Sequence, residues 1–179
     1  MRLLSLIAVL LALCGCASRV PYVSPSGGDT AEVTLLLSGS SSRSPQQPFT
    51  FAEGKQCVGL RWIGDADGPT VRPSYTISVK PVTTTISMQS ARAELIGSMA
   101  VGHSCGGVMS FEPRAGAKYK LAFRDASEKC FVSLTEITAT GDLDLTAQLV
   151  RRTMPLNTMP GDPEKRKMCS DEYVRARLR

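Results

Sequence analysis

Apolar residues at every second position constrain the fold of this chain more than any other feature. Val33, Leu35 and Leu37 alternate with more polar neighbours, and residues 118–124 and 130–138 repeat the pattern. A period of two is typical of strands that bury one face against a core. Turn-forming residues separate such runs at intervals of about 8 to 12 residues, as in folds built from antiparallel strands. We therefore predict an all-β domain.

The predicted architecture is an antiparallel β-sandwich of about eight or nine short strands, immunoglobulin-like or transthyretin-like. Its clearest part is a three-stranded meander over residues 107–140, and residues 143–149 would add one further strand to it. Trp62, the only tryptophan, is expected to anchor the core. The meander comprises residues 108–112, 118–124 and 130–138, and the other predicted strands cover residues 32–37, 49–51, 57–63, 75–79, 82–88 and 92–101.

The N-terminus has the pattern of a secretory signal. Arg2 supplies one positive charge, and residues 3–13 are apolar except for Ser5. As a helix, this stretch would rise about 16 Å, roughly half of a ~30 Å hydrocarbon core, which is too short to span a membrane. We therefore expect an export signal rather than a transmembrane helix.

The end of this stretch decides the kind of signal. Leu13-Cys14-Gly15-Cys16 resembles a bacterial lipobox, with a leucine three residues before the last cysteine and a small residue directly before it. The resemblance implies that the Cys16 thiol carries diacylglycerol, that the chain is cut after Gly15, and that the new amine receives a fatty acid such as palmitate. Three acyl chains would hold the protein essentially permanently, because one chain alone binds only marginally. The alternative is an ordinary secretory signal with Cys16 in a disulfide.

The expected location and domain organisation follow from this anchor. Ala17 is not the aspartate that such lipoproteins use as an inner-membrane retention signal, so the resemblance implies the outer membrane, facing the periplasm. The prolines and glycines after Cys16 favour a flexible tether. The predicted parts are a signal peptide over residues 1–15, a tether over 16–31, the sandwich over 32–153 and a partly helical tail over 154–179.

Beyond the signal, the cysteines predict two disulfides. Cys57, Cys105, Cys130 and Cys169 allow three connectivities in an oxidising compartment. No two of them have the C-x-x-C spacing of a zinc ribbon or redox site. The predicted meander would bring Cys105 beside Cys130, which favours that pair and leaves Cys57 to pin the tail through Cys169.

One segment has the spacing of a catalytic motif. Gly102-His103-Ser104-Cys105-Gly106 matches the G-x-S-x-G nucleophile elbow, in which a strand turns sharply into a helix. Residues 108–123 alternate like strands instead, and the elbow needs a general-base histidine later in the chain. His103 is the only histidine of this chain. We therefore interpret the segment as a glycine-rich loop that positions Cys105, and keep a serine esterase that uses Ser104 as an alternative.

The charged residues favour no other chemistry. The net charge is +5, but the basic residues are scattered and aromatics are only 6%, which argues against nucleic-acid binding. Asp65-Ala66-Asp67-Gly68 lacks the later ligands of a calcium loop and is interpreted as a turn. Asp142 and Asp144 would lie about 7 Å apart on one strand face, which is typical of a solvated surface. We predict no catalytic residue, metal or cofactor.

The chain as a whole resembles small, uncharacterised proteobacterial lipoproteins that carry one disulfide-stapled β domain. The resemblance lies in the lipobox, in Phe111-Glu112-Pro113-Arg114-Ala115-Gly116-Ala117-Lys118-Tyr119, and in Cys130 at the start of the next strand. It implies a non-catalytic lipoprotein that presents a β-sandwich to a protein partner in the cell envelope. The alternatives are a small-ligand-binding or enzyme-inhibitor module, and the esterase.

Overall fold

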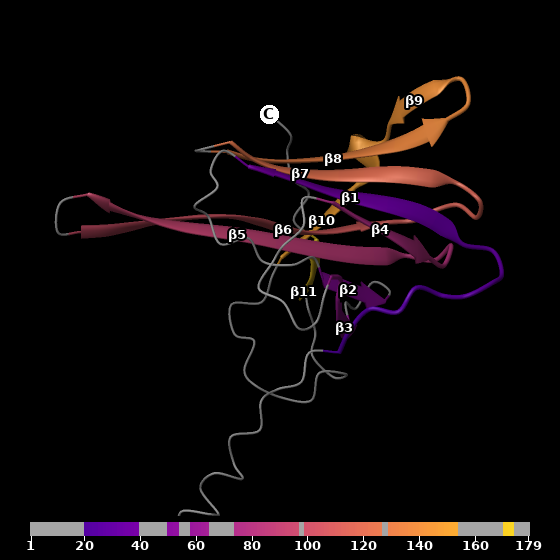
Figure 1. The fold of residues 1–179 in the computed structure, drawn as a ribbon, viewed down its shortest axis with the longest axis horizontal. Helices are drawn as coiled ribbons and strands as arrows, with labels where there is room; N and C mark the ends of the chain where they lie inside the picture. The colour runs from indigo at the N-terminus through magenta and orange to yellow at the C-terminus, as the bar shows by residue number, and fades with distance from the viewer. Residues whose placement is uncertain are drawn as a thin grey trace, which may run out of the picture.

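Two β-sheets pack face to face in the computed structural model of the protein (Figure 1). The structure describes residues 20–39, 50–53, 58–64, 74–96, 99–126, 129–153 and 170–173. Within these ranges lie eleven strands and one short 3-10 helix, η1 (Thr146–Gln148). The strands are β1 (Ala31–Gly39), β2 (Thr50–Glu53), β3 (Val58–Trp62), β4 (Ser74–Val79), β5 (Thr84–Ile96), β6 (Met99–Phe111), β7 (Lys118–Ala126), β8 (Lys129–Thr138), β9 (Gly141–Asp144), β10 (Val150–Thr153) and β11 (Ser170–Tyr173).

The predicted all-β sandwich is confirmed. One sheet has five strands in the order β4-β1-β7-β8-β9, and the other has six in the order β11-β10-β6-β5-β2-β3. All pairings are antiparallel except one, because β1 and β7 run parallel from Glu32 opposite Lys118 to Gly39 opposite Asp125. The described strands outnumber the eight or nine expected, and β5 and β6 are long, with 13 residues each.

The alternating residues of the sequence form the core between the sheets. Val33 and Leu35 of β1 and Leu121 of β7 are 0% exposed. The six-stranded sheet contributes Ile86 and Met109 to the same cluster. Burying such a side chain contributes roughly 1.5–3 kcal/mol, so the shared face of the strands provides most of the stability.

The predicted meander is wrong in its first strand. Residues 108–111 belong to β6, which pairs with β5 and β10 in the six-stranded sheet, whereas the consecutive antiparallel strands are β7, β8 and β9. Residues 113–116 therefore form a corner between the two sheets rather than a hairpin. Gly116 has a positive φ of 73° there and donates its N–H to Thr30 O at 2.8 Å. The main-chain N–H of Arg114 donates to the Tyr119 hydroxyl at 3.0 Å, which fastens the corner to β7.

The strand predicted over residues 143–149 is also wrong. Strand β9 ends at Asp144, η1 follows, and β10 begins at Val150. The Asp144 carboxylate accepts the Thr146 main-chain N–H at 2.9 Å, a local turn contact that stops the strand. Leu145 and Leu149 nevertheless pack against the core, so the apolar alternation here reflects burial without strand structure.

Residues 20–24, within the stretch that the sequence predicted to be a tether, are hydrogen-bonded to the sandwich. Tyr22 N–H donates to Trp62 O at 2.7 Å, and Trp62 N–H donates to Val20 O at 2.9 Å. The Tyr22 hydroxyl donates to Ser78 O at 2.6 Å, and Ser78 N–H donates to Ser24 Oγ at 3.1 Å. Trp62 lies in β3 and Ser78 in β4, the end strands of the two sheets on this side. We call residues 20–24 the strap, because they join both sheet edges.

Two further expectations need correction. Trp62 is only half-buried, and the core residue beside it is Ile63, which is 3% exposed. In the tail, Ser170–Tyr173 forms strand β11 against β10, where part of a helix was expected. Several predicted features lie outside the described residues: the signal and lipobox with Cys14 and Cys16, the turn at 65–68, Cys57, Cys169 and the remainder of the tail.

The strap yields a test of its contribution to stability. Replacing Tyr22→Phe removes the hydroxyl bond to Ser78 O and should lower the free energy of unfolding by about 1 kcal/mol. Tyr22→Ala should lower it by about 2 kcal/mol, because the partly buried ring also packs against the core. Urea unfolding followed by circular dichroism measures both changes.

Val23→Ala is the matched control for these variants. Val23 is 79% exposed, so its truncation should change the free energy of unfolding by less than about 0.5 kcal/mol. A Tyr22→Ala variant as stable as the Val23→Ala variant would show that the strap does not hold the sheets together.

Candidate functional site

The edge of the five-stranded sheet farthest from the strap is the leading candidate surface. Strand β9 ends this sheet, and Figure 1 shows it at the opposite end of the view from β3. All four residues of β9 are exposed. Two of the few large apolar side chains exposed in the described part lie here, Ile137 at 44% and Leu143 at 52%. We call residues 137–144 the distal edge.

The local sequence explains how the distal edge forms. Thr138 pairs with Gly141 across a two-residue turn, and the Thr138 hydroxyl donates to Gly141 O. Gly141 has a positive φ of 132°, which residues with a Cβ rarely adopt. Ile137 lies opposite Asp142, whereas Leu143 lies opposite Glu136. Because neighbouring residues of a strand point to opposite faces, Ile137 and Leu143 present apolar surface on both sides of the edge.

The carboxylates of β9 are engaged in local contacts. Asp142 lies 3.6 Å from the Lys120 ammonium, and the Asp144 carboxylate accepts hydrogen bonds from Thr146. These bonds, from the Thr146 hydroxyl first and its main-chain N–H second, lower the pKa of Asp144. Because the charged form is favoured, the contact is present at neutral pH and is lost as the pH falls below the ordinary carboxyl range. Both side chains are exposed, as expected for a solvated strand face.

The outer face of the same sheet has one further exposed aromatic residue. Phe131 is 43% exposed, and the Arg124 guanidinium lies 4.6 Å from its ring centroid. This cation–π contact covers part of the ring. Ile137 and Leu143 therefore remain the more accessible apolar groups on this side of the protein.

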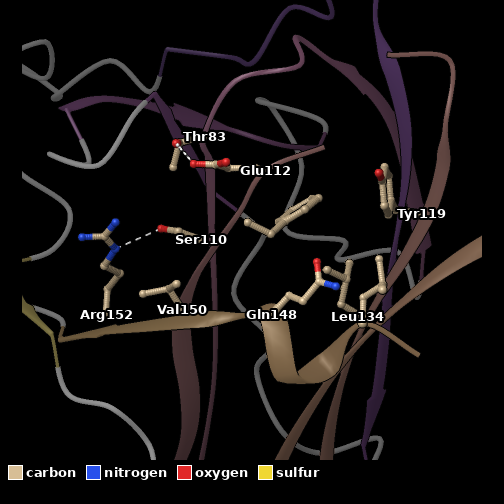
Figure 2. Close-up of a pocket in the computed structure, with 10 residues that line it drawn as sticks. Thr83, Ser110, Glu112, Tyr119, Leu134, Gln148, Val150 and Arg152 are labelled. Carbon is tan, nitrogen blue, oxygen red and sulfur yellow. Dashed lines mark hydrogen bonds between the residues drawn. The ribbon is translucent and has the colours of Figure 1, made fainter. Parts of the chain in front are cut away.

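A small pocket opens where the two sheets meet η1 (Figure 2). Its volume is about 260 Å³. Apolar and polar side chains line it together: Thr83, Ser110, Phe111, Glu112, Tyr119, Leu134, Leu145, Gln148, Val150 and Arg152. Ligand pockets usually measure roughly 300–1,000 Å³, so this one is small for an organic ligand.

The polar groups of the pocket bind one another. The Thr83 hydroxyl donates to Glu112 Oε1 at 3.1 Å, and Arg152 Nε donates to Ser110 Oγ at 3.1 Å (Figure 2). Ser110 Oγ also lies 2.7 Å from Thr85 Oγ1. A ligand would have to compete with these bonds. The pocket therefore gives the small-ligand alternative only weak support.

Arg152 is a buried charge that sequence reasoning missed. It is 5% exposed and bonds across β10 and β6 to Ser110. Its neighbour Arg151, by contrast, is exposed. In β10, Arg152 pairs with Val108 and Arg151 with Met109, so the two side chains lie on opposite faces of the strand.

The segment expected to be a glycine-rich loop is part of a strand. Residues 102–107 lie within β6, where Ser104 pairs with Ala91 and Cys105 with Ser90. The G-x-S-x-G elbow requires a sharp turn from strand to helix, and the backbone here continues as a strand. The loop prediction was wrong because glycines are common in loops but are also tolerated within long strands.

This segment belongs to a two-stranded arm. Strand β2 pairs with β5 only from Thr84 to Ser87, and β10 pairs with β6 only from Val108 to Ser110. Within the described chain, residues 88–107 therefore pair only with each other, and Figure 1 shows this hairpin running past the ends of the other strands. Nine residue pairs correspond to roughly 30 Å of ribbon. An isolated two-stranded hairpin is marginally stable in water, so a covalent link would help to hold it.

The structure places Cys130 in a disulfide, at the start of β8 opposite Asp125. Its second sulfur belongs to a cysteine whose side chain lies outside the described residues. Cys105 lies in strand β6, where it pairs with Ser90. Strands β6 and β8 are also in contact. The predicted meander that first suggested Cys105 as the partner is absent. The contact between the strands that contain the two cysteines is a different reason to expect this pair, which stays a prediction.

Comparisons with known proteins assign no function. No protein-family model matches the chain, and no curated protein or solved structure is significantly similar to it. The part of the chain that the structure describes holds no helix with the length and apolar character needed to cross a bilayer. The same ranges contain no group of three or more residues suited to hold a metal ion.

Peptide mapping under non-reducing conditions tests the disulfide prediction. Trypsin places the four cysteines on separate peptides, residues 56–61, 93–114, 130–151 and 168–175. We expect the peptide with Cys130 to be linked to the peptide with Cys105, and the other two to be linked to each other. A link from the Cys130 peptide to residues 56–61 or 168–175 would contradict this pairing.

Proposed function

We propose that this protein is a non-catalytic lipoprotein of the bacterial cell envelope, anchored through acylated Cys16. Its role is to present the β-sandwich to a protein partner. The observation that carries the proposal is the position of the lipobox-like Leu13-Cys14-Gly15-Cys16, four residues before the strap begins at Val20. An anchor placed directly before a disulfide-containing sandwich fits a domain whose task is to be held at a membrane.

The proposed location is the outer membrane, facing the periplasm. Ala17 stands at the position where an aspartate would favour retention in the inner membrane. The disulfide at Cys130 supports an oxidising compartment, because such bonds persist outside the cytosol.

The distal edge supports a protein partner rather than a substrate. An end strand presents main-chain groups that an extended segment of another protein can pair with. Here Leu143 of β9 and Ile137 of the neighbouring strand β8 are exposed on opposite faces of the sheet, so the edge offers apolar surface on both sides of an added strand. The partner we propose is therefore a protein that adds an extended segment beside β9.

Metabolic labelling tests the anchor. Cells that express the full chain and receive an alkynyl fatty acid should yield labelled protein in the membrane fraction, with the modification on the N-terminal peptide. Cys16→Ser should abolish the label, because it removes the thiol that carries diacylglycerol. Cys14→Ala is the matched control and should keep the label, since alanine is common at that lipobox position. Absence of label from the unchanged protein, or label that persists in Cys16→Ser, would refute the proposal.

Site-specific photocrosslinking in cells tests the partner surface. A photoreactive amino acid at Leu143 should give one discrete adduct with another protein, whereas the same group at Thr76, an exposed position on β4, should not. Ile137→Lys should reduce the adduct about tenfold, which corresponds to a loss of 1.4 kcal/mol of binding.

Arg151→Ala is the control for Ile137→Lys, because Arg151 is exposed but lies on the other sheet. It should leave the adduct unchanged. Equal adducts from Leu143 and Thr76, or an adduct insensitive to Ile137→Lys, would rule out the distal edge as the docking surface.

A further inference from the structure

We propose that the strap is the side of the domain that lies against the lipid headgroups, so that the distal edge points away from the membrane. The inference rests on the proposed acylation of Cys16 and adds an orientation to it. It follows from where the folded domain begins, how the strap is bonded and which residues the strap exposes.

The chain between the anchor and the fold is short. Val20 is the first residue bonded to the sandwich, through its carbonyl to Trp62 N–H at 2.9 Å, and it follows Cys16 by four residues. A fully extended chain spans at most about 3.6 Å per residue, so the Cα atom of Val20 lies within about 14 Å of the Cα atom of the acylated Cys16. A tether of 16 residues, as the sequence suggested, would have reached roughly 50 Å. The bonds of the strap therefore keep the domain at the membrane surface.

The strap fixes both sheets relative to the anchor. It bonds to β3 through Trp62 and to β4 through Ser78, the two end strands on this side. Neither sheet can turn away from the anchor without breaking these bonds. The strands of the five-stranded sheet then follow one another away from the membrane, and β9 lies four strand spacings, or about 19 Å, from β4.

The composition of the strap suits a headgroup surface. Its residues, Val-Pro-Tyr-Val-Ser, include no charged side chain, so no carboxylate must be brought against lipid phosphates. Val23 is 79% exposed, which makes it the most exposed of the large apolar residues in the described part. Contact with the interface would remove this apolar surface from water.

Fluorescence quenching measures the orientation. The full acylated protein carries a fluorescent amino acid at Val23 or, as the matched position, at Ile137, and both positions hold exposed apolar residues. It is reconstituted in vesicles of phosphatidylethanolamine and phosphatidylglycerol that contain a headgroup-labelled nitroxide lipid. We expect quenching at Val23 to exceed that at Ile137 at least fivefold. A 20-residue Gly-Ser insertion between Arg19 and Val20 should reduce quenching at Val23 to near the Ile137 level.

The outcomes separate this inference from the proposed function. Mass spectrometry of the reconstituted protein first establishes whether Cys16 is acylated, and an unmodified Cys16 overturns the lipoprotein proposal itself. If Cys16 is acylated and Val23 is quenched no more than Ile137, the orientation is wrong while the lipoprotein proposal stands. Quenching at Val23 that survives the Gly-Ser insertion would show that the short connection does not set the orientation.

Discussion

Beyond the apolar core between the sheets, the hydrogen bonds of the strap are the contacts that join an edge strand of one sheet to an edge strand of the other. End strands leave rows of main-chain groups unpaired, and proteins cover or protect such edges. Here the strap bonds to Trp62 in β3 and to Ser78 in β4, so a single segment covers both sheets on one side. Because the strap follows the N-terminal segment in the chain, the same contacts would also orient the sandwich relative to the anchor that we propose at Cys16.

The topology reinforces this arrangement. Strand β1 follows the strap and enters the middle of the five-stranded sheet, between β4 and the parallel strand β7. Its residues Val33 and Leu35 are completely buried. Parallel neighbours need long crossover connections, and here β2 to β6 all lie between β1 and β7 in the chain. Strand β1 thus pairs with a strand from the later half of the chain. The strap, which directly precedes β1, is therefore part of the folded domain.

The sequence predicted the strands better than their partners. β1, β4, β7 and β8 were found because each has one buried face, so the period of two survives in the residues themselves. Which strands pair depends on the segments that connect them, and the sequence of a connecting segment specifies its conformation less clearly than apolar alternation specifies a strand. Residues 113–116 suit a hairpin or a corner between sheets, and the deciding bonds from Gly116 to Thr30 and from Glu32 to Ala117 come from distant parts of the chain. The proline- and glycine-rich composition of residues 17–31 gave no sign of the strap, because its bonds use main-chain groups, the Tyr22 hydroxyl and the Ser24 hydroxyl.

Hydrogen exchange measures the central claim most directly. If the strap is bonded to the sheet edges, two amides should exchange at least about a hundredfold more slowly than unbonded exposed amides: that of Tyr22, which donates to Trp62 O, and that of Trp62, which donates to Val20 O. Tyr22→Ala should raise the exchange rate of the Trp62 amide by a larger factor than that of Leu121, in the middle of β7, which rises only with the loss of global stability. Exchange of the Tyr22 and Trp62 amides at the rate of an unstructured peptide in the unchanged protein would contradict the account.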